Sequence, residues 1–245
     1  PSAGVDAMVM FCSADAAQSL FILLGGAPQA GGLWSGPNGA VPSGTFQPGT
    51  DAPGAYVYTV DGTAPCLSDN AVVQVGVSPV ADAGTPGSVT ACSNGTPIDL
   101  FQALGGAPQS GGAWMGPGGV PCGPALDPSS AMGGAYVYTV SAPAPCPQAS
   151  STVDVTIIAV PEPTITSLVG EGCAPVSVVF STDQPVAGNC LWDLGNGQTS
   201  SQCGGDTVVY DVPGNYVVTL TVDVGSGCSG TVAGQAPIAV YAAPV

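Results

Sequence analysis

The stretch GAYVYTV occurs twice in this chain, at residues 54–60 and 134–140, and GNYVVTLTV at residues 214–222 follows the same pattern. Each stretch is rich in β-branched and aromatic residues and follows a glycine-containing turn. Every second residue, beginning with the tyrosine after the glycine, is tyrosine, valine or leucine. A period of two is typical of a half-buried β-strand that is entered from a turn. The sequence therefore predicts three related strands, one in each of three copies of a domain.

A tryptophan and two cysteines accompany each predicted strand at nearly constant spacing. In every copy a cysteine comes first, a tryptophan follows, the tyrosine-containing strand comes next, and a second cysteine ends the unit. An immunoglobulin-like sandwich has this order, with a disulfide across the core and a tryptophan packed on it. We therefore expect an all-β fold of three tandem immunoglobulin-like β-sandwich domains, joined by short, stiff connections into a rod. The three sets are Cys12, Trp34 and Cys66; Cys92, Trp114 and Cys146; and Cys173, Trp192 and Cys228.

The domain boundaries follow from a direct repeat in the first two thirds of the chain. LGGAPQAGGLWSGPNG at residues 24–39 is matched by LGGAPQSGGAWMGPGG at residues 104–119. We assign residues 1–79 to a first repeat, residues 80–160 to a second repeat, and residues 161–245 to a third segment. The glycines and prolines of the matched stretch indicate turns around a short tryptophan-bearing strand, since the stretch has no phosphate-loop lysine.

The charge inventory excludes several classes of function. The chain has 245 residues, of which 16 are acidic and none is lysine, arginine or histidine. Nucleic acid and anionic membrane surfaces are excluded as partners because both require basic side chains. Catalytic arrangements that need histidine or lysine are impossible, and the carboxylates are scattered singly, so we do not expect an enzyme. Membrane insertion is not expected either, because no apolar run approaches the roughly 20 residues that span a bilayer.

The surface must be weakly polar, since only 7% of the residues are charged. Two interpretations fit this composition. One is a monomeric extracellular module, and the other is a surface that is buried against other copies in a fibre or bundle.

Nine cysteines without metal-type spacing indicate disulfides formed in an oxidising, extracellular compartment. Because the first and last cysteines of each copy occupy equivalent places, we expect them to pair within the copy, and elimination leaves one further pair. Cys122 is then a free thiol, either buried and inert or linked to a neighbouring chain. The expected disulfides are Cys12–Cys66, Cys92–Cys146, Cys173–Cys228 and Cys190–Cys203.

The third segment contains WDLGNG at residues 192–197 and YDVPGNYVVTLTV at residues 210–222. These motifs resemble the polycystic kidney disease (PKD) domain, whose hallmark is a W-D-F-G-D-G turn followed by Y-x-x-P-G-x-Y-x-V-x-L-x-V. Leu194 stands for the phenylalanine and keeps an apolar residue, whereas Asn196 replaces the second aspartate and removes a carboxylate. The resemblance implies a PKD-like sandwich for residues 161–245.

The first two repeats resemble repeats found in tandem in giant surface proteins of Bacteroidetes-type bacteria. Those repeats have the form L-G-G-x-P-x-x-G-G-x-W-x-G-P, followed by P-G-x-Y-x-Y-T-V and a late cysteine. In such proteins PKD modules alternate with the repeats, export uses the type IX secretion route, and gliding-motility adhesins are among the examples. The resemblance covers the whole chain.

This resemblance implies a non-catalytic structural or adhesive segment of a long bacterial cell-surface filament or giant adhesin. The expected partners are neighbouring modules of the same long chain, other copies of the chain in a fibre or bundle, and surface glycans or the surface of a prey or host cell. The residues at the two ends resemble the junction between the repeats, so we expect further copies on both sides. The alternative is a carbohydrate-binding or other ligand-binding accessory module of a secreted enzyme.

Calcium is the one cofactor that the composition suggests, because hard oxygen ligands are plentiful and no basic side chain compensates them. The first candidate ligands are Asp193, Asp206 and Asp211, although no Asp-x-Asp-x-Asp loop is present. Asn94 begins an Asn-Gly-Thr glycosylation acceptor. Thr207 lies in Asp-Thr-Val, which resembles the O-glycosylation site of the same bacteria.

Overall fold

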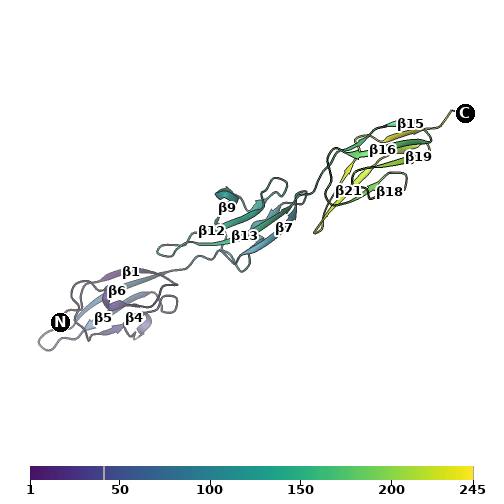
Figure 1. Ribbon diagram of the computed structural model, residues 1–245. Helices are drawn as coiled ribbons and strands as arrows, with labels where there is room; N and C mark the ends of the chain where they lie inside the picture. The colour runs from purple at the N-terminus through teal and green to yellow at the C-terminus, as the bar shows by residue number, and fades with distance from the viewer. Residues whose placement is uncertain (41, 245) are drawn as a thin grey trace. The chain divides into compact units, whose positions relative to one another are not determined.

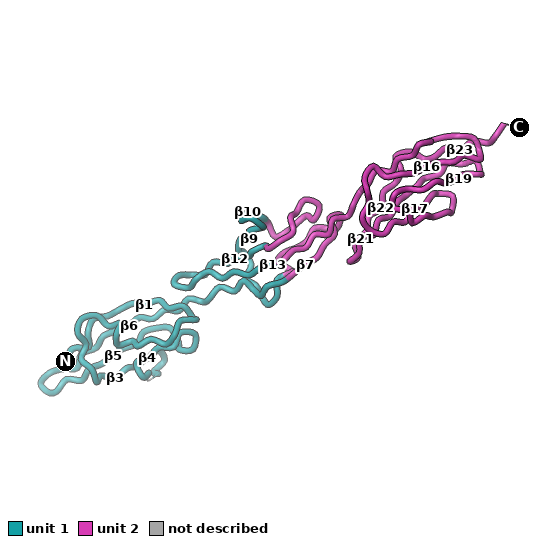
Figure 2. The backbone as a smooth tube through the Cα atoms, in the orientation of Figure 1, with its two compact units in different colours: residues 1–87, 104–122, 136–153 teal, residues 88–103, 123–135, 154–245 magenta. Residues whose placement is uncertain are grey.

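The structure is a computed structural model that describes residues 1–40 and 42–244, and it is built almost entirely of β-strands (Figure 1). No helix in these described ranges is long and apolar enough to cross a membrane. The chain divides into two compact units (Figure 2). The second repeat contributes residues to both of them. Unit 1 comprises residues 1–87, 104–122 and 136–153, and unit 2 comprises residues 88–103, 123–135 and 154–245.

The first repeat forms one four-stranded sheet and one two-stranded sheet. In the larger sheet the strand order is β1-β6-β5-β3, and β1 runs parallel to β6 so that Cys12 lies opposite Ser78. The predicted strand 54–60 is β5, whose alternate residues Tyr56, Tyr58 and Val60 are buried. The larger sheet contains β1 (Ala7–Cys12), β3 (Leu33–Ser35), β5 (Gly54–Val60) and β6 (Asp69–Ser78), and the smaller one pairs β2 (Gln18–Ser19) with β4 (Thr45–Phe46).

The core of the first repeat is centred on its tryptophan and tyrosines. The rings of Trp34 and Tyr58 have centroids 4.9 Å apart. The buried Tyr58 hydroxyl donates to the Gln29 carbonyl at 2.7 Å and accepts from the Gly32 N–H at 2.8 Å. A Cβ on Gly32 would come within 2.5 Å of the Thr59 carbonyl oxygen and 2.7 Å of the Tyr58 ring, so the glycine-rich stretch is required for this close packing.

The second repeat follows the same plan. Its five-stranded sheet has the order β10-β9-β12-β13-β7, and β13 runs through both compact units. Trp114 lies 4.9 Å from Tyr138, ring centroid to centroid, and the Tyr138 hydroxyl binds Gln109 and Gly112 as its counterpart does in the first repeat. The elements are β7 (Gly87–Cys92), β8 (Ile98–Asp99), α1 (Leu100–Ala103), β9 (Ala113–Gly116), β10 (Val120–Cys122), β11 (Ala125–Leu126), β12 (Gly134–Val140) and β13 (Ala149–Ile158).

The third segment forms three sheets around Trp192, which is fully buried. The Trp192 indole N–H donates to the Gln202 carbonyl at 2.9 Å, and the Tyr210 hydroxyl donates to the Leu194 carbonyl at 2.8 Å. These bonds hold the WDLGNG turn against the core. The sheets have the orders β14-β16-β19, β15-β23-β20 and β18-β17-β21-β22. The strands are β14 (Ile165–Ser167), β15 (Glu171–Cys173), β16 (Val176–Thr182), β17 (Asn189–Asp193), β18 (Thr199–Ser200), β19 (Asp206–Tyr210), β20 (Gly214–Tyr216), β21 (Thr219–Gly225), β22 (Cys228–Ala233) and β23 (Ile238–Tyr241).

The prediction of a single strand at residues 214–222 is wrong in one respect, because the structure divides this stretch between two strands, β20 and β21. These two strands pair in different sheets, β20 with β23 and β21 with β17. Between them, the Gly195 turn approaches the Val217 backbone so closely that a Cβ on Gly195 would lie 2.7 Å from the Val217 oxygen. The Gly234 N–H donates to the Val218 carbonyl at 2.9 Å, which continues the register of β21 with β22, so Val218 already belongs to the β21 sheet. The chain therefore changes sheets at this point, while Val218, Leu220 and Val222 stay buried.

Two hydrogen bonds, each between a tyrosine of β5 or β20 and the turn that precedes the strand, support the immunoglobulin-like assignment. The Tyr56 hydroxyl donates to the Ala52 carbonyl at 2.8 Å, and the Tyr216 hydroxyl donates to the Val212 carbonyl at 2.6 Å. Each bond reaches back four residues, which is the tyrosine corner of immunoglobulin-like sandwiches. The all-β, tandem immunoglobulin-like fold is thereby established.

Candidate functional site

The disulfides differ from the expected scheme at most positions. The structure contains Cys12–Cys146, Cys92–Cys228 and Cys190–Cys203, of which only the last is an expected pair. Cys66 and Cys173, which the sequence assigned to disulfides, are exposed free thiols, and Cys122 is a half-buried free thiol. The prediction that the first and last cysteines pair within each copy is therefore wrong.

Strand direction explains this correction. Because β1 is parallel to β6, Cys12 lies at the end of β6, opposite its last residue Ser78, whereas Cys66 comes shortly before the first residue of β6. A strand as long as β6, which has 10 residues, spans about 33 Å. A disulfide requires Cα atoms within about 7 Å of each other. The two cysteines of one repeat thus lie at opposite ends of its sheet.

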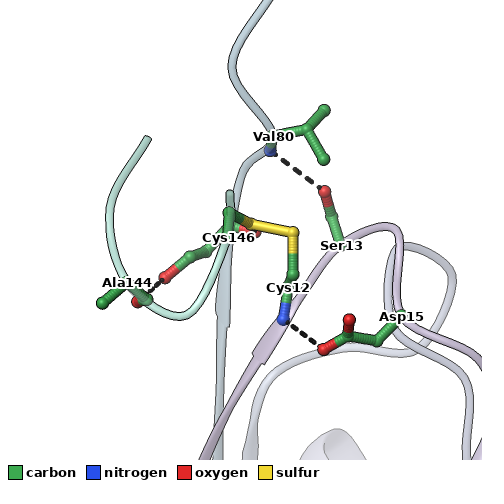
Figure 3. Close-up of a disulfide and its surroundings, with 7 residues drawn as sticks. Cys12, Ser13, Asp15, Val80, Ala144 and Cys146 are labelled. Atoms are coloured by element: carbon green, nitrogen blue, oxygen red, sulfur yellow. Dashed lines mark hydrogen bonds between the residues drawn. A yellow bond between two sulfur atoms is a disulfide. The ribbon is translucent and has the colours of Figure 1, made fainter. Parts of the chain in front are cut away.

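The first joint between repeats is formed by Cys12 of the first repeat and Cys146 of the second (Figure 3). Both are buried, and their Cα atoms are 4.9 Å apart. The Cys12 N–H donates to the Asp15 carboxylate at 2.8 Å, which fixes the end of β1. The Ser78 hydroxyl, at the end of β6, donates to the Ala144 carbonyl at 2.8 Å, so a hydrogen bond crosses the same boundary as the disulfide.

Ser13, the residue after Cys12, makes two further hydrogen bonds at this joint. Its N–H donates to the Ser78 carbonyl at 2.9 Å, and its hydroxyl accepts from the Val80 N–H at 3.3 Å. The side chain therefore holds the connection between the repeats to the end of β1 (Figure 3).

The second joint repeats this arrangement one repeat further along. Cys92 at the end of β7 bonds Cys228 at the start of β22 in the third segment. The Ser93 hydroxyl accepts from the Val160 N–H at 2.9 Å, as Ser13 does with Val80. In addition, the Asn94 amide donates to the Ser229 carbonyl at 2.9 Å. In both cases a cysteine at the end of a strand of one copy bonds the second cysteine of the next copy, which is Cys146 in a loop or Cys228 directly after a turn.

Sequence reasoning missed the hydrogen-bonding residues at these joints. Ser13 and Ser93 follow the strand-end cysteines directly, and this repeated Cys-Ser dipeptide was the signal available in the sequence. Ser78 gave no such signal, because its role depends on where β6 ends.

The three calcium candidates are not brought together as a cation site. No group of three or more cysteine, aspartate or glutamate side chains in residues 1–40 and 42–244 gathers closely enough to hold a metal ion. Asp193 accepts from the Gly195 N–H at 2.9 Å, which is a turn contact. Asp211 lines a shallow hollow of about 190 Å³ that also contains Asn196, and neither of the other two candidates lines it.

Asp206 is engaged by its own neighbours. It accepts from the Ser200 hydroxyl at 2.5 Å and from the Thr207 N–H at 2.7 Å. The Ser200 bond and then the Thr207 bond lower the pKa of the Asp206 carboxyl below its ordinary value. Its oxygens are therefore used to fix the start of β19.

The remaining candidate residues are placed as follows. Asn94 and Thr207 are both exposed, and their glycosylation stays a prediction. The amide of Asn94 already takes part in the second joint. Cys122 lies on β10 opposite Trp114, and burial raises the pKa of its thiol.

A hollow on the third segment has a volume of about 330 Å³. Threonine, serine and glutamine side chains and apolar groups line it, and none of its lining residues is an acid, a base or a cysteine. This composition supplies no general acid, general base or nucleophile with a perturbed pKa.

No model of a known protein family and no curated protein matches the sequence. Among solved structures, an I-band fragment of titin aligns over 97% of this chain and 97% of its own length, with 15% identity and a TM-score of 0.47. Extracellular domains 3–5 of Drosophila OTK align over 97% of this chain and 95% of theirs, with 12% identity and a TM-score of 0.31. Cadherin domains 1–4 of protocadherin gamma B7 align over 96% of this chain and 75% of theirs, with 13% identity and a TM-score of 0.32. The immunoglobulin-like assignment rests on the chain's own strand order, buried tryptophans and tyrosine corners.

Proposed function

We propose that this chain is a non-catalytic structural segment of a long bacterial cell-surface filament or giant adhesin, with residues 1–79, 80–160 and 161–245 as three successive domains. The observation that carries the proposal is that two disulfides join one copy to the next, Cys12 to Cys146 and Cys92 to Cys228. A catalytic or ligand-binding module gains stability from disulfides within its own core. Disulfides across successive boundaries serve instead to keep the copies attached to one another.

The connectivity suits a chain that bears tension. A pull on the two ends passes from residue 1 to Cys12, crosses to Cys146, returns along the chain to Cys92, and crosses again to Cys228. Most of the first repeat and much of the third segment therefore lie outside the shortest covalent route. Those residues cannot be drawn out to their full length while the disulfides are intact, because the bonds carry the load.

The side-chain inventory supports a structural role over sugar binding. Sugar-binding surfaces present exposed aromatic rings, whereas Trp34, Trp114 and Trp192 are all less than 10% exposed. The absence of lysine, arginine and histidine from the sequence removes the side chains of most catalytic arrangements. The burial of all three tryptophans therefore favours the structural role over the accessory module.

The cell-surface setting is supported by the disulfides, which persist in oxidising, extracellular compartments. The resemblance of the repeats and of the WDLGNG turn to modules of Bacteroidetes surface proteins supports export by the type IX route and a PKD-like third domain. Contacts with prey, host or glycan surfaces belong to the same proposal.

The proposal is tested on intact cells of the source bacterium with antibodies raised against the purified chain. Gold-labelled filaments at the cell surface, and a reduced, denatured species much larger than 23.6 kDa, are the expected results. Label confined to the culture fluid, together with a glycan-hydrolysing activity that co-purifies with the chain, would favour the accessory-module alternative.

A further inference from the structure

Cys66 occupies the same place in the first repeat as the disulfide-bonded Cys146 occupies in the second. Each cysteine ends an Ala-Pro-Cys sequence in the loop between the two long strands of its repeat. The loops also share their backbone hydrogen bonding, since Cys66 N–H donates to the Thr63 carbonyl at 2.9 Å and Cys146 N–H donates to the Pro143 carbonyl at 3.0 Å. The Cys66 loop is thus already shaped like the bonded loop, but its thiol is exposed.

Cys173 occupies the place of the strand-end cysteines Cys12 and Cys92. It ends β15, which runs parallel to β23 and places Cys173 opposite Tyr241, as Cys12 is opposite Ser78. The next residue then bonds the closing strand in the same way, because Ala174 N–H donates to the Tyr241 carbonyl at 2.9 Å. The third segment therefore presents the strand-end half of a joint, with an exposed thiol and no loop cysteine on it.

We propose that Cys66 and Cys173 are the two complementary halves of a further joint of the same kind, each of which forms a disulfide with another copy of the repeat. Cys173 receives the loop cysteine of one copy, and Cys66 bonds the strand-end cysteine of another. This inference extends the proposed function by naming the partner at the two unpaired joints. The proposed bond requires only that the partner carry the complementary cysteine, either in the loop between its two long strands or at the end of its first strand.

Within two molecules of this chain the complementary pair is Cys173 of one molecule and Cys66 of the other. The contact joins two different surfaces, so it is heterologous and leaves one free half at each end of the product. Repetition therefore gives open chains of any length. A symmetric contact through one cysteine would stop at a dimer.

The bond forms by thiol–disulfide exchange with a small disulfide oxidant such as oxidised glutathione. The thiolate of one cysteine attacks the oxidant and releases one molecule of reduced glutathione. The second cysteine then attacks the mixed disulfide and releases the other glutathione. Two protein thiols lose two protons and two electrons, and one glutathione disulfide becomes two thiols.

Cys122 provides a matched control because it is the third free cysteine but lies half-buried on β10. Its raised pKa lowers the fraction of reactive thiolate at neutral pH. No strand-end or loop cysteine of the repeat plan corresponds to it, since the first repeat has Ser43 at that position.

The test uses the purified full chain, incubated at high concentration with oxidised glutathione and moderate salt, which screens the repulsion between copies of formal charge −16. Non-reducing electrophoresis should show a ladder that dithiothreitol collapses, and peptide mapping should identify a Cys66–Cys173 link. The Cys122→Ser variant should keep the ladder, while Cys66→Ser and Cys173→Ser should each lose it. Circular dichroism and mapping of the three existing disulfides check that each variant is folded.

A mixing experiment separates directed pairing from random thiol oxidation. Cys66→Ser and Cys173→Ser chains, both also carrying Cys122→Ser, are oxidised separately and then together. Dimers only in the mixture support the proposal, whereas equal dimer formation by each variant alone, or no dimer at all, overturns it. Because this result does not depend on cell-surface labelling, it distinguishes failure of the joint from failure of the proposed function.

The source of the native partner follows from the reduced mass of material isolated from cells. If Cys66 and Cys173 are bonded there and reduction yields species near 23.6 kDa, the partner is a second copy. If reduction leaves a much larger chain, the partner is another part of the same polypeptide. Free thiols at both positions in the native material overturn the inference.

Discussion

Replacing Cys66 by serine is expected to leave the maximum extension of the chain under force unchanged. With the disulfides intact, the shortest covalent route between the ends runs over residues 1–12, 92–146 and 228–245. At about 3.5 Å per residue-to-residue step, this route of about 82 steps reaches about 290 Å, whereas the fully reduced chain reaches about 850 Å. Cys66 does not lie on the route, and it has no disulfide to lose.

The measurement is optical-trap stretching with handles attached to both termini through tags that use no thiol. If Cys12 were instead bonded to Cys66, Cys92 to Cys146 and Cys173 to Cys228, the parent would extend equally far, but Cys66→Ser would extend to about 470 Å. The double variant Cys12→Ser/Cys146→Ser is the positive control, because it opens the first joint and should lengthen the limit to about 380 Å. A rise for the Cys66 variant would refute the joints described above.

Four further outcomes follow from single features. Ser151→Ala should raise the free energy of unfolding by about 1 kcal/mol in urea titrations, because the Ser151 hydroxyl is buried without a hydrogen-bond partner in the described structure and the first repeat has Ala71 there. Burial, with a smaller contribution from Tyr216, raises the pKa of Tyr210 to about 12. The stability that depends on its neutral hydroxyl should therefore be complete below about pH 10 and be lost as the pH rises through about 12, by about 3 kcal/mol in all, and Tyr210→Phe should remove this decline. The lowered pKa of Asp206 has the opposite consequence, so Asp206→Asn should destabilise the chain at neutral pH and differ less from the parent as the pH falls through that pKa, as followed by acid titration of tryptophan fluorescence. Trypsin should leave the reduced, unfolded chain uncut in a mass spectrum, because the sequence has no lysine or arginine.

The sequence predicted the features that depend on local periodicity. The alternation in GAYVYTV was sufficient to predict β5 and β12 as half-buried strands, and in β5 the buried face is formed by Tyr56, Tyr58 and Val60. The position of Trp34 relative to those tyrosines was sufficient to place it in the core. These predictions succeed because a period of two determines which face of a strand is buried.

The misassigned features depend on partners that are distant in sequence. Cys12 and Cys66 are equivalent in spacing to the cysteines of an immunoglobulin-like core, but the parallel pairing of β1 with β6 places them at opposite ends of the sheet. Parallel and antiparallel pairing cannot be distinguished from the six residues of β1 alone. The division of residues 214–222 has a similar origin, because it depends on the Gly195 turn that lies against Val217.

Equivalence between repeats indicated which cysteines share a role, but it did not determine which copy supplies the partner. Pairing within a copy and pairing with the next copy both preserve the repeat, and they differ only by a shift of one unit along the chain. Among three successive copies, the shift leaves one loop cysteine and one strand-end cysteine without a partner in those copies. Cys66 and Cys173 are those two residues, and Cys122 is not one of them. The identity of the exposed thiols is therefore explained by the same one-unit shift that accounts for Cys12–Cys146 and Cys92–Cys228.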